Sequence, residues 1–237
     1  MGLPNLDSRP ASQPVHAVDV QRDVRIRVRD GLELSANLWL PISTGTGQRF
    51  PAILEMIPYR KDDWRWASDE ARGQWLAARG FAFCRLDIRG TGSSPGIALG
   101  EYTVDETNDG YDAVEWLADQ TWSNGNVGMW GISWGGFAAI QVAMLRPPHL
   151  RAIVPVYASD DRYTDDVHYI GGCVTASELS QYAVSMVGSN ALPARPAYRG
   201  EKWEVEWRER LDQTPVWLFE WLRQRPGQVV GKASGGA

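Results

Sequence analysis

Apolar and polar residues alternate near the start of the chain, which is typical of a strand with one buried face. Val24, Ile26 and Val28 are separated by arginines. Asp30-Gly31 follows, a pair that favours a hairpin turn, and the next residues, up to Leu40, predict a second strand. The chain is therefore expected to open with an antiparallel hairpin at the edge of a sheet.

The pattern then changes to short apolar runs separated by segments with helical spacing. Strands are predicted over residues 52–57, 81–88, 127–132 and 150–157, and helices over residues 69–79, 104–117 and 134–145. Strands that alternate with helices indicate a mostly parallel sheet with both faces covered. The sequence thus predicts an α/β fold.

After Ser159 this rhythm stops. Residues 160–222 are acidic, rich in tryptophan and helix-like, without a clear strand, whereas the first residues are rich in proline and serine. We therefore expect a flexible N-terminal segment (1–20), the N-terminal part of an α/β core (21–159), a helical cap insertion (160–225) and an irregular tail (226–237).

Composition narrows the classes of function. The 237 residues carry a formal net charge of −5, which argues against a nucleic-acid partner. No apolar run approaches the length that spans a membrane, and the N-terminus lacks the features of a signal peptide. The two cysteines, Cys84 and Cys173, fit a reducing compartment. A cytoplasmic protein without a membrane partner is the expectation.

Cofactor motifs are weak. The glycine-rich residues 90–96 miss the dinucleotide fingerprint by one position, and residues 227–232 are one residue short of a phosphate-binding loop. The three histidines do not cluster with cysteines, so no metal site is predicted. We therefore predict no cofactor.

The strongest motif is Gly131-Ile132-Ser133-Trp134-Gly135, a G-x-S-x-G match at the junction of a predicted strand and a predicted helix. A nucleophilic serine occupies such a strained turn, and the flanking glycines let strand and helix approach closely. The helix start also offers N–H groups to a developing negative charge. Ser133 is therefore predicted to be a nucleophile; the alternative is a turn serine whose glycines serve packing alone.

An oxyanion hole also needs a donor from the loop after the third strand. That loop contains Tyr59, whose hydroxyl is a candidate donor beside the backbone N–H of Trp134. On spacing alone, a surface aromatic that follows Pro58 is an equally good interpretation of Tyr59.

Three blocks in order carry a resemblance: Pro58-Tyr59-Arg60-Lys61, residues 87–96 (DIRGTGSSPG) and residues 122–133 (WSNGNVGMWGIS). Over roughly residues 22–222, the chain resembles the X-prolyl dipeptidyl-peptidase and cocaine-esterase family of serine hydrolases. The resemblance implies an α/β-hydrolase with a helical cap, which cleaves esters or amides through Ser-Asp-His. It also implies that Ser133 is the nucleophile and that Tyr59 and the Trp134 N–H form the oxyanion hole. We interpret Asp87 and Arg89, which lie in the second block, as loop-building residues.

The family carries its acid and histidine beyond the cap, in blocks that resemble G-W-x-D and P-W-x-H, and neither block occurs in this sequence. A truncated, impaired hydrolase with an exposed apolar edge strand is therefore expected. Twelve helical residues cover about 18 Å, which carries His149 to the opposite edge of the sheet. His168 is better placed, although the acidic run around it favours a solvated face. No triad acid or base is assigned.

Two hypotheses of function follow. The first is a serine hydrolase that acts on a small ester or a peptide, since the two chemistries share one nucleophile. The second is a non-catalytic remnant that binds a partner through tryptophan-rich helices, among them Trp203, Trp207, Trp217 and Trp221. The partner hypotheses are a homo-oligomer and a complementing chain that supplies the missing Asp and His.

Overall fold

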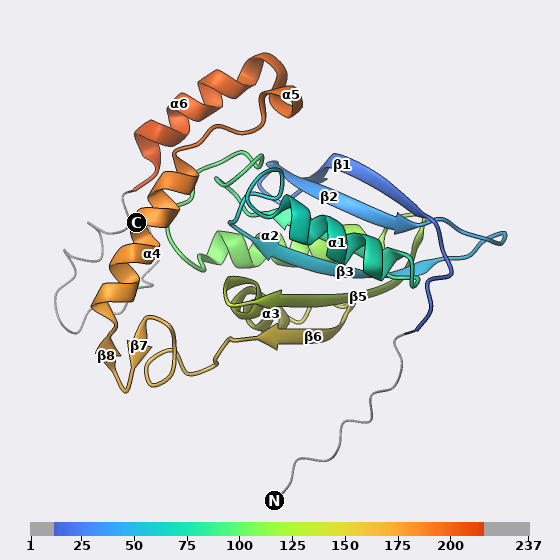
Figure 1. The fold of residues 1–237 in the computed structure, drawn as a ribbon, viewed down its shortest axis with the longest axis horizontal. Helices are drawn as coiled ribbons and strands as arrows, with labels where there is room; N and C mark the ends of the chain where they lie inside the picture. Colours follow the sequence, from blue (N-terminus) through green and yellow to red (C-terminus); the bar gives the residue numbers. More distant parts are fainter. Residues whose placement is uncertain (1–11, 216–237) are drawn as a thin grey trace, which may run out of the picture.

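The computed structural model describes residues 12–215, which form one mixed sheet with helices on both faces and further helices at one end (Figure 1). The six strands lie in the order β1-β2-β4-β3-β5-β6. Their bounds are β1 Val18–Arg27, β2 Glu33–Pro41, β3 Phe50–Ile57, β4 Ala82–Asp87, β5 Ser123–Ile132 and β6 Leu150–Val156. The pairs β1–β2 and β2–β4 are antiparallel, and β3, β4, β5 and β6 are parallel. This confirms the predicted edge hairpin and mostly parallel sheet.

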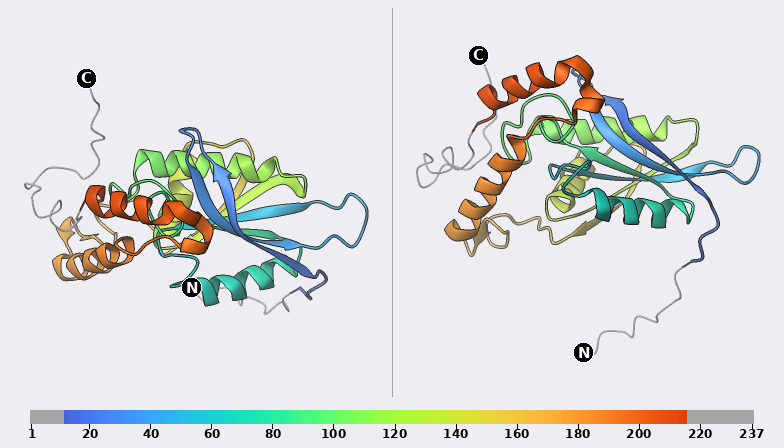
Figure 2. Two further views of the ribbon diagram at one scale, coloured as in Figure 1. Left: turned by 90° about the horizontal axis from the view of Figure 1, so that it is seen from above. Right: turned by 45° about the horizontal axis from the view of Figure 1, so that its top comes forward.

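Three helices cover the sheet. Helix α1 (Trp66–Ala77) lies on one face, and α2 (Val104–Ala118) and α3 (Trp134–Met144) lie on the other (Figures 1 and 2). The larger part of the core fills the space between the sheet and α2 and α3, where Leu54, Val114 and Val142 are fully buried. Under α1, Trp39 packs against Phe83.

The first strand begins earlier than expected. β1 starts at Val18, inside the segment expected to be flexible, so that expectation is wrong for residues 18–20. The backbone before β1 is also hydrogen-bonded to the rest of the fold. Val15 N–H donates to Ala78 O at 2.8 Å, and Ile42 N–H donates to Ala17 O at 2.8 Å. These bonds connect residues 15–17 to the C-cap of α1 and to the residue that follows β2.

The segment after β6 is mainly helical, as predicted. It contains α4 (Ala176–Asn190), α5 (Pro196–Arg199), the 3₁₀ turn η1 (Gly200–Lys202) and α6 (Trp203–Gln213). These elements lie beyond the edge of the sheet toward which β3, β5 and β6 run (Figure 1). Trp217, Trp221 and the tail at 226–237 lie outside the described residues.

The expectation that this segment lacks strands is wrong. A short antiparallel hairpin joins β7 (Tyr169–Ile170) to β8 (Cys173–Val174). Gly171 and Gly172 form its turn with φ values of 57° and 78°, which glycine adopts readily. Between residues 12 and 215, no helix combines the length and apolar character needed to cross a bilayer.

Candidate active site

Ser133 occupies the turn between β5 and α3 in a strained conformation, with φ 55° and ψ −113°. Its N–H donates to Val156 O at 2.8 Å, and its carbonyl accepts from the N–H groups of Gly136 and Phe137 at 2.8 and 3.0 Å. Strand β6 and the first turn of α3 therefore hold the turn from both sides. This is the geometry that lifts a nucleophilic serine above the edge of a parallel sheet.

Close packing between β5, α3 and β3 leaves little room for a Cβ atom at either glycine of the motif. A Cβ on Gly131 would lie 2.4 Å from the carbonyl carbon of Gly135, and a Cβ on Gly135 would lie 3.0 Å from Ile57 Cγ2. The strand and the helix thus approach more closely than any side chain permits. This agrees with the reason given for these glycines from the sequence.

Backbone strain gathers along the same edge. Each of the four parallel strands is followed by a loop with one non-glycine residue at positive φ: Arg60 (49°) after β3, Tyr102 (54°) after β4, Ser133 (55°) after β5 and Tyr157 (49°) after β6. Such conformations cost about 1–3 kcal/mol each and collect at functional sites. We call these four residues the strained rim.

A cavity of about 430 Å³ opens beside Ser133. Core residues Ser133 and Tyr102 form one wall, and the segment after β6 supplies Val167, His168, Gln181, Tyr182 and Ser185. The helical segment thus faces the carboxyl edge of the sheet, where ligands of open α/β sheets bind.

Tyr59 reaches this edge from the loop after β3. Its hydroxyl lies 3.2 Å from the hydroxyl of Tyr182, a residue that lines the cavity. Burial raises the pKa of both phenols, so both hydroxyls stay protonated and able to donate. Trp134, the other candidate donor, is the first residue of α3 and is fully buried.

His149 is remote from Ser133, as predicted. It precedes β6 at the opposite edge of the sheet, and its Nδ1 lies 2.7 Å from Glu115 Oε2. This imidazole is held by α2 and contributes nothing to the cavity.

His168 does share the cavity with Ser133. Its Nε2 lies 2.7 Å from Glu101 Oε2, and both side chains are close to fully buried. The sequence reasoning missed Glu101. Its position could have indicated it, because Glu101 follows β4, and β4 ends at the same edge of the sheet as the Ser133 turn.

The acidic run near His168 is only partly a solvated face. Asp161 is exposed, but Asp166 is buried, accepts from Arg162 Nε at 2.8 Å and receives the His168 N–H at 3.2 Å. Arg162 also lies over the Tyr102 ring, 4.1 Å from its centroid. The run therefore helps to fix the cavity wall.

Asp87 and Arg89 organise loops, as interpreted from the sequence. The buried Asp87 carboxylate accepts from the N–H groups of Lys61 and Ser93 at 3.0 and 3.1 Å. Arg89 donates to both oxygens of Asp109 at 2.6 Å, which fastens the loop after β4 to α2. In the part of the chain that the structure describes, no three His, Cys, Asp or Glu side chains gather as a metal site.

A mostly parallel sheet covered on both faces, with a strained serine on a strand-to-helix turn at its carboxyl edge, defines an α/β-hydrolase. The sequence profile described as X-Pro dipeptidyl-peptidase (S15 family) matches residues 30–229. The chain therefore belongs to this family of hydrolases.

Curated relatives agree with this assignment. A putative serine esterase of Mycobacterium bovis is 33% identical over 162 residues, which cover 62% of this chain and 26% of the relative. The cocaine esterase of a Rhodococcus species is 30% identical over 183 residues, 77% of this chain and 31% of that protein. This chain thus spans between about a quarter and a third of their length.

Solved structures show the same fold. A CocE/NonD family hydrolase from Staphylococcus aureus matches with a TM-score of 0.63 at 25% identity, covering 73% of this chain and 33% of that one. An aminopeptidase from a Thaumarchaeota archaeon matches in fold, with a TM-score of 0.58 at 20% identity over 78% of this chain and 33% of that one.

Proposed function

We propose that this chain is a serine hydrolase of ester or amide bonds, with Ser133 as its nucleophile. The observation that carries the proposal is the Ser133 turn, strained at φ 55° and open to a cavity of about 430 Å³. The relatives named serine esterase and cocaine esterase support ester chemistry. The name of the matched family, X-Pro dipeptidyl-peptidase, supports peptide bonds as the second substrate class.

In the proposed reaction, Ser133 Oγ attacks the carbonyl carbon of the bound substrate. The carbonyl oxygen becomes an oxyanion, which accepts hydrogen bonds from the Trp134 N–H and the Tyr59 hydroxyl. Collapse of the tetrahedral species expels the alcohol or amine, which leaves with the proton taken from Ser133. Water then releases the acyl group from Ser133 by the same steps in reverse order.

We assign no general base to this reaction. Of the three histidines of the chain, all of them within the described residues, His168 is the one that lines the cavity with Ser133. Without a base, an oxyanion hole and binding leave a residual acceleration of roughly 10³–10⁴ over water. A measurable but slow reaction of the chain alone is therefore proposed.

The test is covalent labelling with a fluorophosphonate, a probe that reacts with activated serines. Peptide mapping should place the label on Ser133, and Ser133→Ala should abolish it. Ser180→Ala is the matched control, since Ser180 is an exposed serine on α4 that donates to Ala176 O at 2.7 Å. Labelling that persists in Ser133→Ala would identify another serine as the nucleophile.

The substrate class is tested in the same preparation. Rates with an activated acetate ester and with an X-Pro anilide are compared for the unmodified chain and for Ser133→Ala. Ester turnover that requires Ser133, with no anilide turnover, supports the esterase. Turnover of the anilide that also requires Ser133 supports the peptidase.

A further inference from the structure

Glu106, in the first turn of α2, is a buried acid outside the proposed chemistry, and it hydrogen-bonds to the residue beside the nucleophile. Its side chain is 3% exposed, and its Oε1 accepts the indole N–H of Trp134 at 2.6 Å. Its backbone N–H donates to the Thr103 hydroxyl, which caps α2. The carboxyl group is therefore held at a fixed place behind the Ser133 turn.

Trp134 transmits this constraint to the site. It follows Ser133 directly, its side chain is fully buried, and its ring lies 4.5 Å from the ring of Tyr102. The backbone N–H of Trp134 is also the proposed oxyanion donor. A displacement of the indole would therefore change the direction of that N–H.

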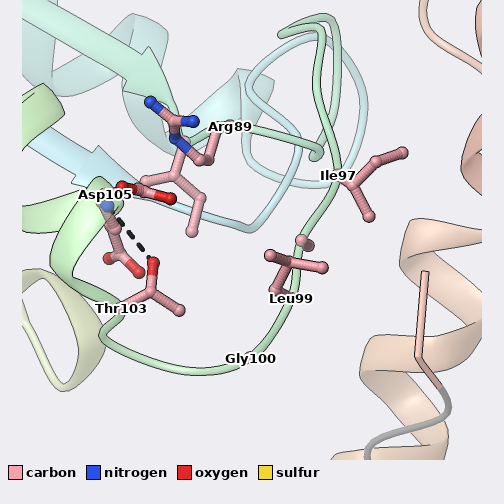
Figure 3. A pocket seen from close by; sticks show the side chains of 9 residues that line it. Arg89, Ile97, Leu99, Gly100, Thr103 and Asp105 are labelled. Carbon is pink, nitrogen blue, oxygen red and sulfur yellow. Dashed lines mark hydrogen bonds between the residues drawn. The ribbon is translucent and has the colours of Figure 1, made fainter. Parts of the chain in front are cut away.

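A second cavity reaches Glu106 from behind. It has a volume of about 190 Å³, and Glu106 lines it together with Arg89, Ile97, Leu99, Thr103 and Asp105. Figure 3 shows this cavity between the loop at Ile97 to Gly100 and the start of α2. Because Glu106 is among the lining residues, this cavity is the route by which we expect protons to reach its buried carboxyl group.

Burial raises the pKa of Glu106 to about 8, and the charges of Asp109 and Glu101 act in the same direction. The indole N–H of Trp134 acts in the opposite direction. The titratable and charged groups around Glu106 come from four parts of the fold. They are Asp105 and Asp109 on α2; Arg89, Glu101 and Tyr102 on the loop after β4; Tyr59 after β3; and, in the segment after β6, Arg162 over Tyr102 and His168 on Glu101. The carboxyl group thus holds its proton to a higher pH than an exposed glutamate does.

We propose that Glu106 is a positioning residue that fixes Trp134, and through it the oxyanion donor beside Ser133, and that its ionisation slows acylation of Ser133. The inference rests on the proposed function of Ser133. A neutral carboxyl group accepts the indole hydrogen bond and adds no charge to the site. An ionised one adds a negative charge on the far side of the Trp134 indole from its backbone N–H, and like charges repel across a dry interior.

The first experiment tests the link without any need for catalysis. The chain is labelled with ¹⁵N at its tryptophan indoles, and the Trp134 signal is identified by its loss in Trp134→Phe. That signal should shift with a midpoint near pH 8 in the unmodified chain and should not shift over this range in Glu106→Gln. A Trp134 signal that does not respond to pH would overturn the proposal.

The second experiment measures the rate of fluorophosphonate labelling of Ser133 from pH 6 to 10. The ratio of the rate in the unmodified chain to the rate in Glu106→Gln should fall by about tenfold as the pH rises through 8, because a barrier change of about 1.4 kcal/mol is tenfold in rate. Glu106→Gln is the reference for this fall, since glutamine keeps an acceptor for the indole and does not ionise. In Trp134→Phe the fall should move to higher pH, because the bond that lowers the Glu106 pKa is gone.

Asp105→Asn is the matched control, because Asp105 lines the same cavity but is exposed. It should keep the alkaline fall relative to Glu106→Gln. A ratio of unmodified chain to Glu106→Gln that does not change with pH would overturn the inference and leave the function of Ser133 intact. If Ser133 is not labelled at any pH, the proposed function fails, and the coupling of rate to Glu106 fails with it, whatever the indole titration shows.

Discussion

At the scale of single residues, we propose that the two hydrogen-bonded phenols, Tyr59 and Tyr182, have separable roles. The Tyr59 and Tyr182 hydroxyls lie 3.2 Å apart, and only Tyr59 comes from the loop that supplies an oxyanion donor in this fold. Tyr59→Phe keeps the ring and removes the donor. We predict that kcat for an activated ester falls on the order of 10²–10³, with a much smaller change in KM.

The control for this prediction is Tyr182→Phe, which removes the hydroxyl that Tyr59 contacts but leaves Tyr59 able to donate. Its kcat should change by less than about tenfold. Equal losses in both variants would mean that the pair acts as one structural unit, and an unchanged kcat in Tyr59→Phe would exclude it from the oxyanion hole. Thermal unfolding of both variants checks that the fold is kept.

Single residues also show what the sequence permits one to foresee. The Ser133 turn was predictable because its conformation and its close glycines impose a local motif. The Glu101–His168 pair was not, because the two residues stand 67 positions apart and meet only after the cap segment has folded over the sheet. The Glu106–Trp134 bond, across 28 positions, was missed for the same reason.

At the scale of elements, one buried arginine fastens α6 to the core. Arg210 is 4% exposed and donates to the carbonyl groups of Gly92 and Ser94, in the loop after β4, at 3.2 and 3.0 Å. It also donates to Leu192 O at 3.3 Å, between α4 and α5. Two of these bonds join α6 to the loop after β4, and the third joins it to the connection between α4 and α5.

We predict that Arg210→Ala destabilises the protein by roughly 1–3 kcal/mol, because buried carbonyl groups lose their donor. Hydrogen exchange should accelerate in α6 and in residues 90–95, while the central strands stay protected. Arg208→Ala is the control on the same helix, since Arg208 is exposed and pairs with Glu204 one turn away. Its effect should stay below about 0.5 kcal/mol, and an equal effect of the two variants would contradict the anchoring role.

The elements of the core were foreseen well, and those outside it less well. Apolar residues at helical spacing mark α2, whose predicted start at Val104 is confirmed. In contrast, β5 begins at Ser123, four residues before its predicted start. Helix α1 begins at Trp66, three residues before its predicted start, and has no side-chain hydrogen bond at its N-cap to signal that start. The β7–β8 hairpin has only two residues in each strand, too few for any period to be visible. Whether such short strands form depends on the conformation of the turn that joins them and on the residues against which they pack.

At the scale of the whole molecule, β6 is the last strand of the sheet and, within residues 12–215, it pairs only with β5. Val154 on this strand is 55% exposed, and Ile132 and Tyr157 nearby are 40% and 85% exposed. An unpaired apolar edge favours association between chains. The exposed edge expected from the sequence is therefore present in the described part of the chain.

We predict that Val154→Lys reduces concentration-dependent aggregation severalfold in light scattering, because a lysine on an edge strand opposes strand pairing. Its stability should change by no more than about 0.5 kcal/mol, as for other exposed positions. Val205→Lys, at a 69% exposed position on α6, adds the same charge away from the edge. Equal protection by both variants would assign the effect to net charge alone.

The strained rim also has a consequence for the order in which the molecule comes apart. Four residues held in unfavourable backbone conformations lower the free energy of local opening at the carboxyl edge, while the parallel strands that precede them are held by hydrogen bonds to their neighbours in the sheet. On warming, the mouth of the site should therefore melt as a small unit of its own, below the temperature at which the sheet unfolds. The cavity beside Ser133 would then lose its ordered structure at a lower temperature than the sheet does.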